Sequence, residues 1–375
     1  MISILKEISK IRKGAALVVD YKNSNRYRVV AIEPNGSKTA YYFTVPIYNN
    51  RTRKAVDMKF YAKGGTIYST GSNANITITD KVTMENSEGS CIISLSNRAT
   101  RISDDKIVCG NEQLYPTTNG IAIKSSCEEE KSYTFYLETS KPFLEVRAND
   151  KYFALMSEKF RPFVVISCIG TSDVNGNIIS PAKISYQKIT DRKYIITITP
   201  CFKLGNLVLI ETNLYEPKLF QDTTVESKNP KTNNAFGSIG FIGTTNDFGE
   251  QWLYSRPDFS KIDDLGNRTI NKATWYIPAL GNSNLNVCIT EVLSRFCSFG
   301  SNWNNKKSGH KRSNISEIIP GYHKIDLTNM ITRDHRLLTT SEGFILKNAI
   351  KNSGFSAIST GDSFYSPQIL EITFT

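Results

Sequence analysis

The sequence lacks most of the signatures that would assign it to a membrane protein or to a known class of enzyme. No apolar run reaches the roughly 18 residues that a membrane-spanning helix needs, so no transmembrane segment is predicted. A nucleophile elbow, a phosphate-binding Walker loop and a zinc-binding His-Glu-x-x-His motif are all missing. We therefore predict a protein that binds or assembles, with no enzyme activity and no cofactor.

Cysteine is not arranged as a disulfide framework or a zinc site. The count is odd, the spacing is wide, and no Cys-x-x-Cys pair occurs, which predicts free thiols. The seven positions are Cys91, Cys109, Cys127, Cys168, Cys201, Cys288 and Cys297.

Metal-binding patterns are also poor. The three histidines (His310, His323 and His335) fall in loop-like contexts, so a metal trio is kept only as an alternative. Residues 172–177 have a superficial likeness to a calcium loop but lack the closing Glu, and their Asn-Gly pair predicts a hairpin tip. We predict no bound metal.

Positive charge is in excess. The formal net charge of +11 favours acidic partners through long-range attraction. Basic residues are not interleaved with aromatics along one strand face, as they are in single-strand binders, so no nucleic-acid partner is predicted. The remaining candidate partners are an acidic protein shell and an anionic cell-wall polymer.

Residues 1–14 predict a short helical arm. Ile4, Leu5, Ile8 and Ile11 have the spacing of one helix face, and Gly14 would end the helix. Nearby charges interrupt any signal-peptide core, so no secretion leader is expected. So short a helix is marginal in water by itself. It must dock either on its own domain or on a partner, and its four apolar residues are therefore candidate particle-docking residues.

Residues 15–205 consist of short strand-like runs separated by turn residues, beginning with a hairpin around residues 22–25. This pattern predicts an all-β sandwich or barrel rather than alternating strands and helices. We interpret the region as a β-rich attachment region. A split into sub-domains 15–120 and 130–202 is an alternative. Beyond the N-terminal arm, helix is predicted only at residues 150–159 and, as a single turn, at 327–333.

The C-terminal region, residues 216–375, has turns and aromatics in a fixed order between apolar runs. It also contains all three tryptophans and all three histidines, which indicates a domain boundary near residues 205–220. The ordered segments are Asp222-Thr223-Thr224-Val225, Asn229-Pro230, Trp275-Tyr276-Ile277-Pro278, Ser301-Asn302-Trp303-Asn304-Asn305-Lys306, Ile325-Asp326-Leu327-Thr328, Gly343-Phe344-Ile345-Leu346-Lys347 and Ser359-Thr360-Gly361-Asp362-Ser363.

In this order the segments resemble the DNRLRE domain, a β-sandwich displayed on cell surfaces and particles and related to carbohydrate-binding modules. Pro257 departs from the family pattern and predicts a strand edge or bulge. The resemblance implies a jelly-roll-type sandwich that follows the N-terminal β-rich region. Asp326-Leu327-Thr328 is expected to form a corner in which a side-chain oxygen accepts a backbone N–H.

A carbohydrate site needs aromatic faces for the sugar rings and amides for the hydroxyl groups. The candidate ligand-binding residues are Trp252, Tyr254, Trp303, Asn304, Asn305, Tyr322 and Tyr365. The competing interpretation is that Trp275 and Trp303 are core or plug residues.

Together these features predict a non-enzymatic virion structural protein of a bacteriophage or phage-like particle. We expect it to decorate the capsid, to contact other virion proteins and to face host-surface polysaccharide, with a homo-oligomer possible and no membrane partner. It would be assembled in the host cytoplasm. The alternatives are a tail or baseplate fibre protein and a non-virion carbohydrate-binding accessory protein of a polysaccharide-degrading system.

Overall fold

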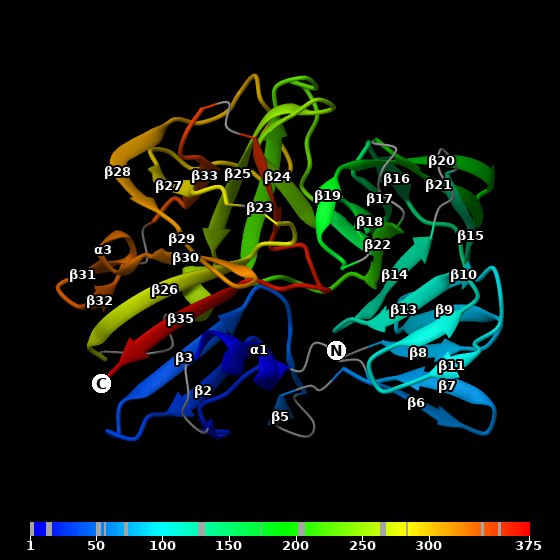
Figure 1. Ribbon diagram of the computed structural model, residues 1–375, viewed down its shortest axis with the longest axis horizontal. Helices are drawn as coiled ribbons and strands as arrows, with labels where there is room; N and C mark the ends of the chain where they lie inside the picture. Colours follow the sequence, from blue (N-terminus) through cyan, green and yellow to red (C-terminus); the bar gives the residue numbers. More distant parts are fainter. Residues whose placement is uncertain are drawn as a thin grey trace. The chain divides into compact units, whose positions relative to one another are not determined.

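The computed structural model describes residues 4–12, 17–49, 54–55, 58–70, 74–126, 132–173, 175–201, 207–262, 268–282, 284–338, 341–351 and 354–375 (Figure 1). Strands make up 56% of the chain and helices 5%, which confirms the predicted all-β class. The described strands form antiparallel sheets, none of which closes into a barrel. Among the described residues, no helix has the length and apolar character needed to cross a membrane.

The chain divides into two compact units. Unit 1 contains residues 56–216 and 236–238, and unit 2 contains residues 4–55, 217–235 and 239–375. Unit 1 is therefore inserted, in sequence, into unit 2.

Unit 1 is a β-sandwich of two sheets. The first sheet has the order β20 (Ala182–Thr190), β21 (Lys193–Pro200), β15 (Tyr133–Thr139), β10 (Gly89–Ser94), β9 (Lys81–Asn86), β8 (Asn75–Ile78), β7 (Thr66–Ser69) and β6 (Phe60–Lys63). The second has the order β11 (Arg101–Ile102), β12 (Ile107–Cys109), β13 (Glu112–Pro116), β14 (Gly120–Ser126), β22 (Leu207–Leu214), β18 (Arg161–Ser172), β17 (Tyr152–Glu158) and β16 (Glu145–Ala148), with β19 (Ile178–Ser180) paired to β18.

The core of unit 1 follows from two-residue alternation. In β15, Tyr133, Phe135 and Leu137 point inward while the intervening residues are exposed. They share one core with Ile166 and Ile210 of the opposite sheet. β10 pairs with β15, so strands from both of the alternative sub-domains, 15–120 and 130–202, lie in one sheet of one compact unit.

The helix predicted at residues 150–159 is wrong, because this segment forms β17. Its run from Tyr152 to Met156 is buried throughout, since Phe153 and Leu155 enter the sandwich core while Tyr152, on the other face, packs against Phe236. A strand buried on both faces does not alternate, so its apolar run could not be told from a buried helix. The hairpin tip near Gly176 is confirmed: Asp173 Oδ1 accepts the Asn177 N–H at 2.8 Å, and Gly176 has φ +91°.

Unit 2 is a second β-sandwich. One sheet has the order β1 (Val18–Val19), β2 (Arg28–Ile32), β3 (Lys38–Phe43), β35 (Ile369–Phe374), β26 (Ile270–Pro278), β30 (Tyr322–Asp326) and β29 (Glu317–Ile319). The other has the order β28 (Gly309–Ile315), β27 (Val287–Val292), β33 (Phe344–Asn348), β25 (Gly249–Pro257), β24 (Ile239–Thr245) and β34 (Phe355–Ser359), with β23 (Phe220–Glu226) paired to β25. Short elements complete the unit: α1 (Ile4–Ile11), α2 (Phe259–Ile262), α3 (Thr328–Ile331), the β4–β5 pair (Tyr48–Asn49 and Lys54–Ala55) and the β31–β32 pair (Thr332–Arg333 and Arg336–Leu337).

The two ends of the chain meet in unit 2. β3 pairs with β35 in a register that places Ala40 opposite Ile372 and Tyr42 opposite Leu370, and all four residues enter the same core (Figure 1). The compact units therefore differ from the predicted ranges: the part of the 15–205 region before residue 56 belongs with the C-terminal sandwich. Without β3, one side of β35 would be an unpaired edge.

The predicted N-terminal helix is present as α1. Ile4 and Ile8 are fully buried, Ile11 is nearly so, and Leu5 is half-buried. Within unit 2, the Tyr322 hydroxyl donates to Glu7 of the helix, and Arg12 Nη2 lies 2.5 Å from Glu33 Oε2. The helix is thus part of its own fold, and its apolar face is not an exposed particle-docking surface.

Candidate functional site

Two of the predicted ligand-binding aromatics, Trp252 and Trp303, lie side by side in unit 2. Their ring centroids are 5.3 Å apart with an angle of 56° between the planes, and both side chains are half-buried. In β25, Leu253 enters the sandwich core, so its neighbours Trp252 and Tyr254 lie on the opposite face of the sheet. The pair therefore belongs to the outer face of this sheet.

The connection between β27 and β28, residues 293–308, carries Trp303 onto that face. Phe296 packs on Tyr254 with ring centroids 5.5 Å apart, and the buried Tyr254 hydroxyl donates to the Lys307 carbonyl at 2.6 Å. Asn233 Nδ2 donates to the carbonyls of Ser298 at 2.6 Å and Ser301 at 2.7 Å. These anchors hold the connection against the sheet and fix the position of Trp303.

The tip of this connection uses its asparagines differently. Asn302 Oδ1 accepts the N–H groups of Asn304 and Asn305 at 3.0 and 3.3 Å, while Asn305 Nδ2 donates to the Gly300 carbonyl at 2.9 Å. The Asn305 side chain therefore stabilises the conformation of the loop. The Asn304 side chain is exposed beside the tryptophans, and its backbone N–H donates to the Pro230 carbonyl at 3.1 Å.

Two lysines lie over the tryptophan rings. Lys306 Nζ is 4.1 Å from the centroid of Trp303 and 5.6 Å from that of Trp252, and Lys347 Nζ is 5.5 Å from the latter. Trp252 Nε1 donates to Glu250 Oε1 at 2.9 Å. Lys306, Lys347 and Glu250 were not among the ligand-binding residues predicted from the sequence. Glu250 and Trp252 are two residues apart on β25 and so share a face, which the sequence could have indicated. Lys347 is on β33, and the sequence does not show that β33 pairs with β25.

The other predicted aromatics do not join this cluster. Tyr254 is fully buried beneath it, and burial raises the pKa of its hydroxyl. Tyr322 lies on β30, in the other sheet, where it is buried against Tyr276 and bonded to Glu7. Tyr365 is half-buried in the segment between β34 and β35. Neither Tyr254 nor Tyr322 can stack on a ligand, because sugar stacking needs an exposed ring face.

We name the cluster of Trp252, Trp303, Asn304, Lys306 and Lys347 the tryptophan patch. It offers two half-buried aromatic rings, an exposed amide and two ammonium groups, one on the anchored connection and one on β33. Aromatic rings bind the apolar faces of sugars, while ammonium groups bind carboxylates, phosphates or sulfates. Trp275, in contrast, is fully buried with Phe220 and Phe344, as a core residue.

The histidines do not form a metal site in the described structure. His323 is fully buried between the hydroxyls of Ser316, 3.2 Å from Nδ1, and Ser356, 2.8 Å from Nε2. Burial lowers the pKa of His323 to about 4. His335 lies on the short connection of the β31–β32 pair, and the His310 side chain is outside the described residues. No group of three or more His, Cys, Asp or Glu side chains among the described residues could hold a metal ion.

The predicted corner at residues 326–328 is confirmed. Asp326 Oδ1 accepts the N–H of Thr328 at 2.8 Å and its hydroxyl at 2.6 Å, and α3 begins there. A polar hollow of about 650 Å³ lies beside this corner, with Asn314, Asn329 and Arg333 in its lining. It does not include the tryptophan patch. Six cysteines are free thiols, as predicted, and Cys127 lies outside the described residues.

No family model matches this sequence. No curated protein matches it either. The resemblance to the DNRLRE domain therefore stays a prediction that rests on the ordered segments of residues 216–375.

Proposed function

We propose that this chain is a non-enzymatic structural protein of a bacteriophage or phage-like particle, and that it decorates the capsid while unit 2 binds glycan on the host surface. The observation that carries the binding part is the tryptophan patch, in which a loop anchored to the sheet places Trp303 beside Trp252. The DNRLRE resemblance supports the display part.

The chemistry of the patch favours an acidic glycan. Lys306 covers one face of Trp303, so a neutral sugar would have to displace an ammonium group whose contact with the ring contributes roughly 0.5–1 kcal/mol. An acidic sugar offers that ammonium a carboxylate or phosphate in exchange, and its ring can then stack on the tryptophan. Lys347 adds a second cation nearby.

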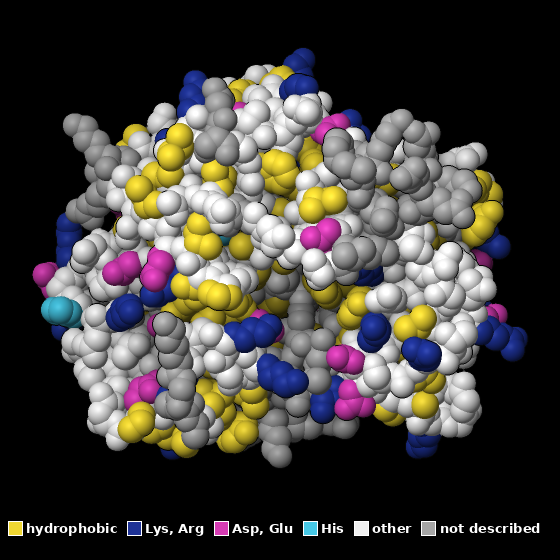
Figure 2. Space-filling view, in the orientation of Figure 1, with side chains coloured by type: hydrophobic (Ala, Val, Ile, Leu, Met, Phe, Trp, Pro, Cys, Tyr) yellow, Lys and Arg dark blue, Asp and Glu magenta, His cyan; other side chains and the backbone are white. Residues whose placement is uncertain are grey.

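The overall charge works in the same direction. With a net charge of +11 the protein attracts anionic surfaces over distances comparable to the screening length of the solution. Figure 2 shows Lys and Arg side chains scattered over the visible face, mixed with Asp and Glu, rather than gathered in one patch. Such a distribution gives diffuse attraction, while the orientation of the ligand would depend on the tryptophan patch. Many copies on one particle would make weak individual binding effective through avidity.

The particle assignment is tested by peptide mass spectrometry and immunogold labelling of purified particles from the source strain. We expect the protein to co-purify with particles and the label to lie on the head. Label on the tail would favour the fibre alternative over capsid decoration. Its recovery only in the soluble or cell-wall fraction would overturn the virion proposal and favour the accessory-protein alternative.

A further inference from the structure

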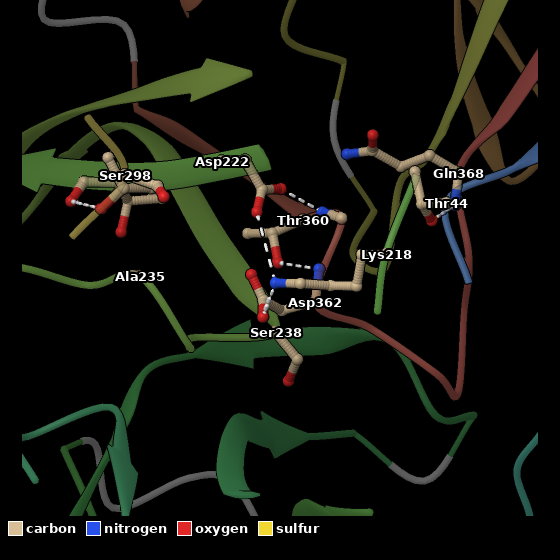
Figure 3. Close-up of polar contacts among 12 residues, drawn as sticks. Thr44, Lys218, Asp222, Ala235, Ser238, Ser298, Thr360, Asp362 and Gln368 are labelled. Atoms are coloured by element: carbon tan, nitrogen blue, oxygen red, sulfur yellow. Dashed lines mark hydrogen bonds and ion pairs between the residues drawn. The ribbon is translucent and has the colours of Figure 1, made fainter. Parts of the chain in front are cut away.

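A buried lysine and two buried aspartates of unit 2 meet at one point, away from the tryptophan patch. Lys218 Nζ contacts Asp362 Oδ1 and lies 4.0 Å from Asp222 Oδ1. Only 10% of the Lys218 side chain, 7% of that of Asp362 and none of that of Asp222 is exposed. Figure 3 shows the three side chains pointing toward one another. Burying three ionisable groups this completely costs free energy unless their charges neutralise one another.

The charges of this cluster do not balance if all three groups are ionised, because two carboxylates face one ammonium. Asp222 Oδ1 and Asp362 Oδ2 then have no hydrogen-bond donor among the described residues. A proton on one carboxyl group allows the two to share a hydrogen bond. Burial, and then the neighbouring Asp362, raise the pKa of Asp222 well above its usual range, while Lys218 opposes the shift. Asp222 is accordingly the protonated member.

The backbone around the cluster holds the groups in contact. The N–H of Gly361 donates to Asp222 Oδ2, and the N–H of Asp362 donates to the Thr360 hydroxyl at 3.1 Å. A Cβ at Gly361 would lie 2.8 Å from Asp222 Oδ2, so only glycine allows this approach. Phe220, one of the residues between the lysine and Asp222, is 1% exposed. Burial to this degree favours the uncharged forms of the ionisable groups.

We propose that Lys218 and Asp362 form an intramolecular isopeptide bond, with Asp222 as the proton shuttle. Transfer of a proton from the Lys218 ammonium to the Asp362 carboxylate leaves a neutral amine beside two carboxylic acids. The amine nitrogen attacks Asp362 Cγ, and the Asp222 carboxyl group donates a hydrogen bond to the developing oxyanion. Asp222 then carries a proton from the nitrogen to the departing hydroxyl. The N–C bond forms, the C–OH bond breaks, one water is released, and no oxidant or cofactor is required.

Asp362 rather than Asp222 is the acceptor, because Lys218 Nζ contacts Asp362 Oδ1 and lies 4.0 Å from Asp222 Oδ1. The bond would join positions 144 residues apart. It would tie the start of β23, directly after the return of the chain from unit 1, to the segment that precedes the last strand, β35. A covalent tie at this point would prevent the two ends of residues 218–362 from separating under load.

The test is the intact mass of the purified full-length protein under denaturing conditions, followed by peptide mapping. We expect a mass one water molecule below that of the sequence, and a branched peptide joining Lys218 to Asp362. The exposed pair of Lys261 and Asp258, 3.1 Å apart, serves as an internal control and should stay unlinked. The full sequence mass, or a linkage at any other pair, would overturn the proposal.

Four variants sharpen the assignment. Lys218→Arg and Asp362→Ala should each restore the full mass of their own sequences. Asp362→Asn should lose ammonia in place of water if it still reacts, because the leaving group is then the amide nitrogen. Asp222→Asn keeps the side-chain shape but removes the proton shuttle, and the cross-linked fraction should fall at least about tenfold at equal times after synthesis. A cross-link unaffected by Asp222→Asn would contradict its role. Circular dichroism checks that each variant is folded.

Discussion

The ammonium group of Lys306 lies 4.1 Å from the centre of the Trp303 ring. The lysine is three residues beyond the tryptophan in the same anchored connection, and it donates a hydrogen bond back to the Trp303 carbonyl at 3.2 Å. The aromatic ring and the cation therefore act as one unit. A ligand that contacts the ring must either displace the lysine or bind it.

Replacing Lys306 by glutamine should separate the two contributions. We expect the affinity for an anionic polysaccharide to fall about fivefold, equivalent to about 1 kcal/mol, and to depend less steeply on salt. Affinity for neutral glycans should not fall. Binding titrations at low and high salt measure both effects. Lys22→Gln is the matched control, since Lys22 is an exposed lysine in the β1–β2 connection, which belongs to the other sheet of unit 2. Equal losses in both variants would assign the effect to overall charge.

The stability of unit 2 should fall in acid because of His323. Its folded-state pKa of about 4 lies below the value of 6.5 for a free histidine, because burial disfavours the charged ring. The unfolded chain therefore binds the proton more readily than the folded chain does. The stability that comes from keeping His323 neutral is fully present above pH 6.5 and is lost as the pH falls toward 4. Between pH 7 and pH 4.5 we expect a loss of about 2–3 kcal/mol. Urea unfolding at a series of pH values, with His323→Gln as comparison, should show a flatter pH dependence in the variant. An equal slope in both proteins would rule out His323 as the cause.

The N-terminal helix should stabilise the fold. Ile8→Ala removes a fully buried side chain and should lower the free energy of unfolding by about 2–4 kcal/mol. Lys10→Ala, at a position whose side chain is 60% exposed, should change it by less than about 0.5 kcal/mol. Chemical denaturation measures both. If Ile8→Ala left the free energy of unfolding unchanged, α1 would not be packed on its own domain. The helix would then again be a candidate docking arm.

Gly120→Ala should unfold unit 1 selectively. A Cβ at this position would meet the Thr212 carbonyl oxygen and lie 2.7 Å from Asn213 Cα, so β14 and β22 could not keep their pairing. We expect a cost above about 3 kcal/mol. Gly64→Ala is the control, because a Cβ there has open space and only the positive φ of +60° opposes it, at about 1 kcal/mol. Hydrogen exchange should report lost protection in unit 1 and intact protection in unit 2. Loss of protection in both units together would contradict selective unfolding of unit 1.

Local sequence patterns predicted the strands well and their partners poorly. The first hairpin is present, since β1 pairs with β2 across residues 20–27, and the short turn at α3 lies within residues 327–333 as expected. Alternation and turn residues are local signals, and they were sufficient for these elements. The pairing of β3 with β35 joins residues more than three hundred positions apart. Nothing in the pattern of either strand identifies the other, so the insertion of unit 1 was not foreseen.

The candidate site was predicted in part for the same reason. Trp252 and Trp303 have side-chain chemistry that can be recognised without a structure, and their rings do come together, with Asn304 next to Trp303 in the chain. Tyr254 and Tyr322 have the same chemistry, but the strand face on which each lies buries it. Lys218, 144 residues from Asp362, gave no local signal at all, because a buried ion cluster becomes visible only when distant segments are brought into contact.

The most direct test of the binding claim is a titration of the purified full-length protein against a panel of anionic and neutral polysaccharides, comparing wild type with Trp303→Ala. Tyr136→Ala, at an aromatic residue that is 60% exposed in unit 1, is the matched control. The account predicts weak binding of at least one anionic polysaccharide, reduced about tenfold or more by Trp303→Ala and unchanged by Tyr136→Ala. Binding that survives the loss of Trp303, or the absence of binding to every polysaccharide, would contradict it.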